Sequence, residues 1–159
     1  MRPTQAPLLT PDTLYQHLRG HRRLTRRTIE AFPDDQLFTF RPAPPMRSFG
    51  DLMREVIDMV TPTMRGLTSG EFTWSPPRHG SSKTELLAEW DEADAELDKV
   101  WPSLHPEHFT TEASWFGLPP SSGLNKVLYL IDNEVHHRAQ GYVYLRLLGI
   151  EPPPFYERG

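Results

Sequence analysis

The sequence contains no cysteine, and this absence excludes several kinds of chemistry at once. A chain of 159 residues without cysteine has no disulfide framework, no zinc–thiolate site and no cysteine nucleophile. Long hydrophobic runs are also missing, because no apolar stretch approaches the ~20 residues of a membrane-spanning helix. The opening segment, MRPTQAPLLTPDT, holds too short an apolar run for a secretory signal. We therefore expect a cytoplasmic protein without a membrane partner.

Basic residues are fewer than acidic residues. The chain has 17 lysine and arginine residues against 21 aspartate and glutamate residues, which gives a formal charge of -4. This balance argues against nucleic acid or an anionic membrane surface as the main partner. No internal repeat is visible, and the length suits one domain with a sizeable core. We expect a single domain over residues 1–159.

Apolar residues recur at helical spacing in four segments, which predicts helices over residues 11–32, 48–70, 82–101 and 122–148. Thr10 can cap the first helix, with Pro11 at the favoured first position. Ser48 with Asp51, and Ser82 with Glu85, have the spacing of capping boxes. Pro62 should kink the second helix, and Gly149 should end the fourth.

The fourth segment carries apolar residues over such a wide arc that we expect it to be central and the most buried helix. Glu134 and Arg138 have the spacing of a favourable ion pair, which we expect on its wet side. Three long connections separate the helices: a proline-rich crossing at 33–47, a polar loop at 71–81, and a segment at 105–123 whose interior could pair as a short hairpin. The fold class is therefore all-α, a four-helix bundle with long inter-helix loops.

Two adjacent histidines, His136 and His137, point about 100° apart on a helix and cannot share one task. His137 lies on one line with Asn133 and Tyr144, whereas His136 lies with Asp132. We therefore expect His137 to face the interior. A histidine in a bundle helix is more often a satisfied core or surface residue than a metal ligand, so spacing alone leaves both readings open.

His17 and His21 stand one turn apart on the first helix, a spacing that can clamp a metal. Nothing nearby in the sequence completes such a site, so we interpret His21 as a histidine at the edge of the core. Because it falls on the apolar stripe, His21 could still line a pocket.

Two stretches, SFGDLMREVIDM (48–59) and NEVHHRAQGYVYLRLLGIEPPPFY (133–156), resemble the signature regions of the DinB superfamily, which includes the YfiT-like proteins. The proline-rich segment before the second helix is also typical of it. This resemblance covers nearly the whole chain. It implies a DinB-like four-helix bundle, often a homodimer, with one divalent metal ion between helices.

The family's metal ligands are one histidine on the second helix and an HxxxH pair on the last. Residue by residue, the resemblance carries these positions over to Glu55, Asn133 and His137. A carboxylate is a sound replacement, but a carboxamide is a weak, neutral ligand. The resemblance thus implies a zinc, nickel, manganese or iron site with reduced zinc affinity. The opposing reading is that the metal is lost and Asn133 only hydrogen-bonds His137.

Three functions follow as hypotheses. The first, implied by the resemblance, is a metal-dependent transferase that joins a low-molecular-weight thiol such as bacillithiol or mycothiol to a small electrophile, or a hydrolase, with His21 and Tyr144 lining its pocket. The second is a non-catalytic, metal-free bundle that binds a small ligand. The third is a ferritin-like carboxylate site, since Glu134 and His137 have the Glu-x-x-His spacing of di-iron bundles. That design needs further inward glutamates; the first helix offers only Glu30, and we expect the third helix to put its acids on the wet face.

The first and fourth helices carry more apolar and aromatic residues than the inner seam of one small bundle needs. Surplus apolar surface usually marks an interface. Together with the habit that the resemblance implies, this predicts a two-fold homodimer.

Overall fold

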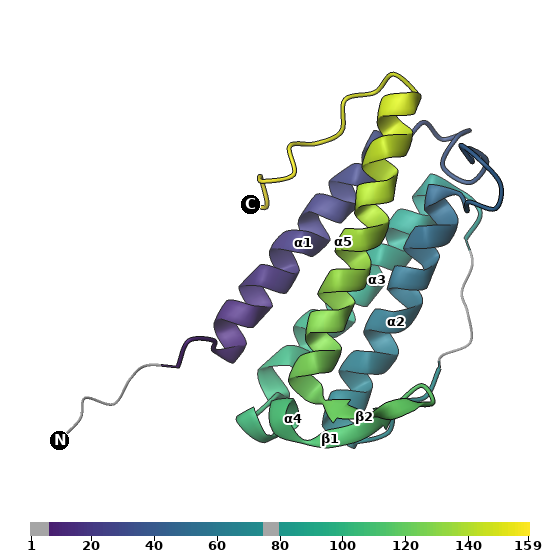
Figure 1. Cartoon of the computed structure of the whole chain (residues 1–159). Helices are drawn as coiled ribbons and strands as arrows, with labels where there is room; N and C mark the ends of the chain where they lie inside the picture. The colour runs from purple at the N-terminus through teal and green to yellow at the C-terminus, as the bar shows by residue number, and fades with distance from the viewer. Residues whose placement is uncertain (1–6, 75–79) are drawn as a thin grey trace.

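The computed structural model describes residues 7–74 and 80–159 and is mostly helical. Its long helices are α1 (Pro11–Ala31), α2 (Phe49–Ser69), α3 (Lys83–Val100) and α5 (Gly123–Leu147) (Figure 1). Shorter elements lie between α3 and α5: the 3-10 helix η1 (Trp101–Ser103), α4 (Pro106–Thr110), β1 (Glu112–Trp115) and β2 (Leu118–Ser122). The predicted class, an all-α bundle of four principal helices, is confirmed.

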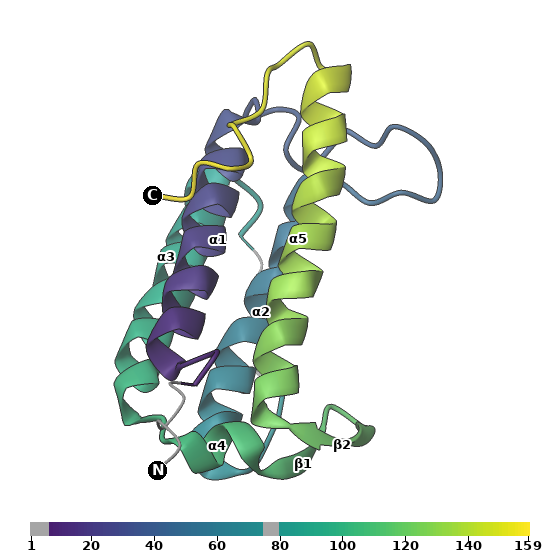
Figure 2. The same ribbon diagram turned by 60° about the vertical axis from the view of Figure 1, so that its left-hand side comes forward.

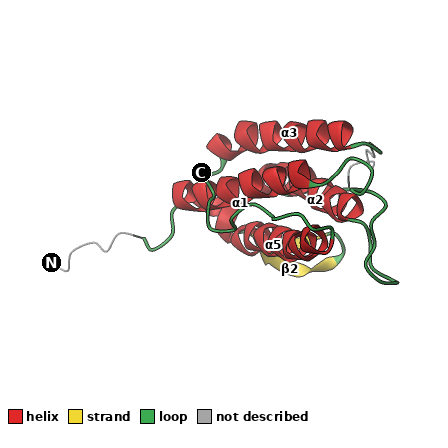
Figure 3. Cartoon of the chain, turned by 90° about the horizontal axis from the view of Figure 1, so that it is seen from above, coloured by secondary structure: helices red, strands yellow, loops and turns green. Residues whose placement is uncertain are grey.

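The four long helices run side by side, with α4 and the β1–β2 hairpin at one end (Figures 1 and 2). Seen from above, α3 and α5 lie on opposite sides, with α1 and α2 between them (Figure 3). Accordingly α2 packs against both α3 and α5, and α1 does the same. The segment after α5 returns along α1 (Figure 2), where Arg23 Nε donates a 3.0 Å hydrogen bond to the carbonyl of Arg158.

The helix ends follow the local signals closely. Thr10 caps α1, and Ser82 with Glu85 forms the predicted capping box at α3. Ser48 caps α2 by accepting from the amide of Asp51 at 3.2 Å. The reciprocal bond expected there does not form, because the Asp51 carboxylate accepts from the Ser48 hydroxyl at 2.7 Å and pairs with Arg54. Gly149, with φ 77°, ends the last helix as predicted.

The connection before α5 contains more structure than the sequence predicted. The hairpin is present, with β1 and β2 paired antiparallel. The short helices η1 and α4 were missed, because each is about one turn long and has no periodic pattern; both carry a proline in their first turn. Of the predicted polar loop at 71–81, residues 75–79 lie outside the described residues.

Two apolar clusters fill the bundle. The cluster near the hairpin includes Leu18 on α1 and Ile131 on α5, and the other includes Ile29 and Tyr144. Between the clusters lies a layer of buried polar and charged side chains from α1, α3 and α5: His21, Arg22, Thr25, Asp94, Glu134 and Arg138. In the cluster that includes Ile29 and Tyr144, α2 and α5 come very close, because a methyl group on Gly141 would overlap the ring of Phe49.

The burial of individual side chains corrects three expectations. The Glu134–Arg138 pair was predicted on the wet side, yet Glu134 is 1% and Arg138 6% exposed, because α1 supplies their partners. The acids of α3 were expected outside, but Asp94 is buried against Arg22. α5 was predicted to be the most buried helix; instead 12 of the 21 residues of α2 are buried, against 11 of 25 in α5. One face of α5 stays open to solvent.

Candidate functional site

The α2–α5 seam brings Glu55 and His137 into direct contact. Glu55 Oε1 and His137 Nε2 are 3.0 Å apart. His137 is buried, whereas the side chain of Glu55 is 37% exposed, so the pair connects the interior to solvent. His136 is exposed and faces away. The phase argument for the two histidines is therefore confirmed in its geometry.

Each member of the pair has a second contact. Glu55 Oε2 accepts from Arg47 Nη1 at 2.5 Å, and His137 Nδ1 lies 3.2 Å from Gln140 Oε1. Partial burial by itself would raise the pKa of Glu55. The hydrogen bonds from Arg47 and His137 and their positive charge outweigh burial, and the pKa of Glu55 is lowered. Glu55 is therefore a carboxylate at neutral pH.

The hydrogen-bonding directions within this group leave a place for one cation. Gln140 Oε1 can only accept, so His137 Nδ1 carries the proton that joins them. His137 Nε2 then faces a carboxylate oxygen, and this contact is favourable only with a proton or a metal ion between the two atoms. Two ligands about 2.1 Å from a zinc ion lie about 3.4 Å apart at a tetrahedral angle. The observed 3.0 Å needs only a small opening to fit that geometry.

Asn133 lies one turn before His137 and faces the same seam. Its Nδ2 donates to the sulfur of Met59 at 3.6 Å, and Met59 lies one turn after Glu55 on α2. Within the part of the chain that the structure describes, no three His, Cys, Asp or Glu side chains gather in a group that could hold a metal ion. The donor set is thus one carboxylate, one imidazole and one carboxamide. It fits a divalent ion through Glu55 and His137, with Asn133 as a weak third donor.

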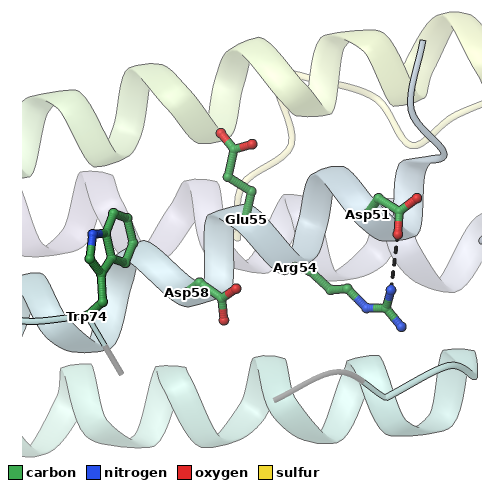
Figure 4. A pocket seen from close by; sticks show the side chains of 5 residues that line it. All are labelled: Asp51, Arg54, Glu55, Asp58 and Trp74. Carbon is green, nitrogen blue, oxygen red and sulfur yellow. Dashed lines mark hydrogen bonds and ion pairs between the residues drawn. The ribbon is translucent and has the colours of Figure 1, made fainter. Parts of the chain in front are cut away.

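A cavity of about 350 Å³ opens beside Glu55. Its lining residues are Asp51, Arg54, Glu55, Asp58 and Trp74 (Figure 4). Figure 4 shows the Glu55 side chain directed toward α5, with Trp74 closing one end of the cavity and the Asp51–Arg54 ion pair at the other. Glu55 belongs both to this cavity and to the pair with His137, whereas His137 itself does not line the cavity.

Two residues predicted to line the pocket stand elsewhere. The hydroxyl of Tyr144 donates to the carbonyl of Arg47 at 3.0 Å, so this buried tyrosine holds the segment that carries Arg47 and does not line the cavity. His21 lies on the α1–α5 seam, where Arg138 Nη2 donates to its Nδ1 at 3.0 Å. The structure therefore brings Glu55 and His137 into contact, while the Asn133 amide lies on Met59 of the same α2–α5 seam. His21 lies in a separate polar cluster.

The contacts of His21 explain why it does not form a metal clamp with His17. The guanidinium groups of Arg138 and Arg158 lie 3.0 Å from His21 Nδ1 and 3.3 Å from its Nε2, and His17 Nε2 lies 3.2 Å from the same Nε2. Guanidinium groups can only donate hydrogen bonds. Two positive charges on the ring nitrogens of His21 therefore disfavour a metal ion between His21 and His17.

Replacing His21 should flatten the acid side of the stability profile. Burial, with the positive charges of Arg138, Arg158 and His17, lowers the pKa of His21 to about 3 from 6.5. Between pH 3 and 6.5 the unfolded chain binds a proton at His21 and the folded chain does not. The contribution of His21 to stability is therefore complete above pH 6.5 and is lost as the pH falls toward 3. We expect His21→Gln to reduce the slope of unfolding free energy against pH by up to about 1.4 kcal/mol per pH unit.

Urea unfolding at a series of pH values between 4 and 7 measures this slope. The exposed His136 provides the control, since His136→Gln should follow the parent profile. Parallel profiles for the parent and His21→Gln would show that His21 is not held neutral by its surroundings.

The charged layer beside His137 fixes how α5 sits in the bundle. Glu134 Oε1 accepts from the hydroxyl of Thr25 at 2.5 Å, and its Oε2 lies 3.3 Å from Arg22 Nη1. Arg22 also donates to Asp94 at 2.6 Å and lies 3.5 Å above the Trp90 ring. Glu134 bonds to side chains of α1, whereas His137 contacts Glu55 on α2. The Glu-x-x-His spacing therefore does not form a ferritin-like site.

Several contributors to the site gave no signal in the sequence. Arg47 sits at the end of the proline-rich crossing, and Trp74 lies in a polar loop, where no periodicity predicts direction. Gln140, three residues after His137 on the same helix, could have been found from spacing alone.

Among residues 7–74 and 80–159, none of the helices has the length and apolarity that a membrane crossing requires.

Solved structures with this architecture are known. A DinB-like protein from Bacillus subtilis superposes with a TM-score of 0.76 at 18% identity, covering 92% of this chain and 99% of that protein. A DinB-like protein from Bacillus cereus gives a TM-score of 0.73 at 19% identity, covering 91% and 97%. At such identities the likeness concerns the fold. A search of curated proteins finds no match.

The family assignment rests on the sequence as a whole. The model of the DinB family matches residues 3–159, which span all four long helices, the α2–α5 seam and the hairpin. Sequence signature and bundle architecture agree, and the chain belongs to the DinB family.

Proposed function

We propose that this protein is a cytoplasmic, metal-dependent enzyme of the DinB/YfiT-like type. Glu55 and His137 would hold one divalent ion, and the substrate would be a small electrophile that accepts a low-molecular-weight thiol such as bacillithiol or mycothiol, or water. The observation that supports the proposal is the 3.0 Å contact between Glu55 Oε1 and His137 Nε2, which needs a proton or a metal ion between the two atoms, with Glu55 at the edge of an open cavity.

The residues divide the work as follows. Gln140 holds the Nδ1–H of His137 and so directs the free electron pair of Nε2 toward Glu55. The Asn133 carboxamide, one turn away, can turn to orient a substrate or supply a weak third donor. A divalent ion bound here would lower the pKa of a thiol or a water molecule and so supply a nucleophile at neutral pH. Trp74 offers an apolar wall, 57% exposed, against which the organic part of a substrate can pack.

Arg47 sets the metal preference in this proposal. Its guanidinium forms an ion pair with Glu55 Oε2 and competes with any metal ion for the carboxylate. With one imidazole and otherwise oxygen donors, the site should bind zinc weakly and should favour manganese or iron more than a three-histidine site does.

Two substitutions should strengthen zinc binding. Asn133→His adds an imidazole one turn before His137 on the same face, and Arg47→Gln removes the competing cation from Glu55. We expect each to raise zinc affinity by about tenfold or more, which corresponds to about 1.4 kcal/mol. Arg41→Gln is the matched control, because Arg41 pairs at 3.5 Å with Asp51 and does not touch Glu55.

Competition with a chromogenic chelator measures these affinities. No gain in either Asn133→His or Arg47→Gln would mean that neither side chain faces the cation position. For catalysis, the metal-loaded protein would be mixed with bacillithiol or mycothiol and an aryl halide. The thiolate sulfur bonds to the ring carbon, halide leaves, and free thiol is lost; metal-dependent loss above background is expected.

A metal-free binding module is the second candidate, and one observation favours it. Arg47 and a protonated His137 together would already neutralise both oxygens of Glu55. In that case the cavity binds a small ligand without turnover. Equilibrium dialysis against manganese and zinc separates the two functions, since the second predicts no metal retained by the parent protein.

A further inference from the structure

The indole of Trp74, which closes one end of the cavity beside Glu55, is stacked on a second aromatic ring. The ring centroids of Trp74 and Phe116 lie 3.9 Å apart, and the two planes differ by 19°. Trp74 nevertheless remains 57% exposed and lines the cavity. Phe116 thus supports one face of the indole, and the indole still offers open aromatic surface to a molecule in the cavity. We call Trp74 and Phe116 the aromatic platform.

Phe116 stands in the turn of the β1–β2 hairpin, in a backbone conformation that phenylalanine rarely adopts. Its φ is 49°, and no other non-glycine residue among 7–74 and 80–159 has a positive φ; Gly117 follows at 79°. Two-residue hairpin turns of this kind favour asparagine, aspartate or glycine, and a bulky side chain is disfavoured there. The turn therefore does not explain the phenyl ring. Its contacts do, because it links Trp115, at 5.5 Å between centroids, to Trp74.

The hairpin that carries Phe116 is fixed to the bundle at both strands. Trp115 is 4% exposed, and its Nε1 donates to Thr63 Oγ1 on α2 at 3.2 Å. Lys126 of α5 is buried, and its ammonium donates to the carbonyl of Ala113 on β1 at 2.9 Å and to a carbonyl of β2. These bonds tie the hairpin to two helices, so Phe116 presents a fixed surface to Trp74.

Trp74 is also held through the chain that precedes it. Phe72, two residues earlier, packs so closely on α2 that a methyl group on Gly66 would overlap its ring. The ammonium of Lys126 lies 4.9 Å from the centroid of the same ring. The indole therefore has its place before any ligand arrives, and binding to a surface that is already ordered costs less conformational entropy.

The rest of the cavity lining is polar and carries more negative than positive charge. It consists of three carboxylates and one guanidinium, from Asp51, Arg54, Glu55 and Asp58 on α2. Arg54 pairs with Asp51 at 3.0 Å, and Figure 4 places Asp58 between Trp74 and Arg54. Ionised carboxylates only accept hydrogen bonds, so they favour a cationic donor group and repel an anion. An indole beside carboxylates suits a flat ring that bears such a group.

We propose that the cavity binds a planar aromatic molecule with a positively charged nitrogen group. Its ring would stack on the aromatic platform, and its nitrogen group would bond to the carboxylates of α2. The volume of about 350 Å³ lies within the range of small-molecule sites. This proposal rests on the proposed function in one respect, since it names the kind of substrate that the same cavity would take. Phe116 is a positioning residue, because it acts through Trp74.

Ligand-observed NMR titration of the metal-free protein with three probes of similar size tests the ligand class. Benzamidine has the flat ring and the positive charge, cyclohexanecarboxamidine has the charge without the flat ring, and benzoate has the ring with the opposite charge. We expect benzamidine to bind about tenfold more tightly than either of the others. No binding of benzamidine, or binding of either other probe with equal or greater affinity, would overturn the proposal. Because no metal is present, this result is independent of whether Glu55 and His137 hold an ion.

Substitutions in the aromatic platform test its role. Trp74→Leu should weaken benzamidine binding by about tenfold. Phe116→Gly suits the turn and should leave the circular dichroism spectrum unchanged, yet it should also weaken binding, whereas Phe116→Tyr keeps a ring and should bind as the parent does. Phe155→Leu is the control, since Phe155 is an exposed aromatic residue that does not line the cavity. Parent-like affinity in Trp74→Leu would overturn the proposal, and parent-like affinity in Phe116→Gly would overturn the positioning role.

Discussion

Replacing Glu134 with alanine should lower the free energy of unfolding by about 3–5 kcal/mol, because it leaves buried charge without its partner. Glu134 is 1% exposed, and its two oxygens serve Arg22 and Thr25 on α1. Without this carboxylate, Arg22 keeps only Asp94 as an anionic partner, and the Arg138 guanidinium loses its only nearby opposite charge on α5. Neither arginine can reach water from its buried position without disturbing the helices.

Urea unfolding monitored by circular dichroism at pH 7 measures this loss. Glu30→Ala is the control, since Glu30 pairs with Arg26 on the surface, where removal should cost less than about 1 kcal/mol. Glu134→Gln, which keeps the shape and part of the hydrogen bonding, should fall between the two. A loss below 1 kcal/mol for Glu134→Ala would show that the buried layer is not what holds α1 against α5.

The helices of this protein are predictable from local signals, and the charged layer is not. Thr10, Ser82 and Gly149 act on backbone groups within a few residues, so their effect is visible in the sequence itself. Glu134 and Arg138 look like a surface pair, because one turn of spacing is the usual pattern of exposed ion pairs. Their burial follows from Arg22 and Thr25, more than 100 positions away, and no periodicity reveals such partners.

The candidate site divides in the same way. Helical phase predicts that His137 faces inward and His136 outward, and the resemblance locates Glu55 opposite it. Tyr144 was expected in the pocket because it shares the line of His137. Its hydroxyl instead finds the carbonyl of Arg47, whose position depends on the path of the proline-rich crossing. The path of the irregular segments between the helices cannot be predicted from the sequence pattern.

His137→Ala should remove divalent metal binding, the second large effect expected here. His137 supplies the only nitrogen ligand of the proposed site, and Glu55 with Asn133 offers oxygen donors alone. The loss should exceed the roughly 10–100-fold that removal of a supporting hydrogen bond to a ligand costs. His136→Ala is a control matched in residue type, helix and sequence position, because His136 is exposed on the same turn of α5.

Isothermal titration calorimetry of manganese and nickel into the parent, His136→Ala and His137→Ala proteins tests the proposed site most directly. The account predicts one ion per chain in the parent and in His136→Ala, and no measurable binding in His137→Ala. Equal binding in all three proteins, or retention in His137→Ala with loss in His136→Ala, would contradict it.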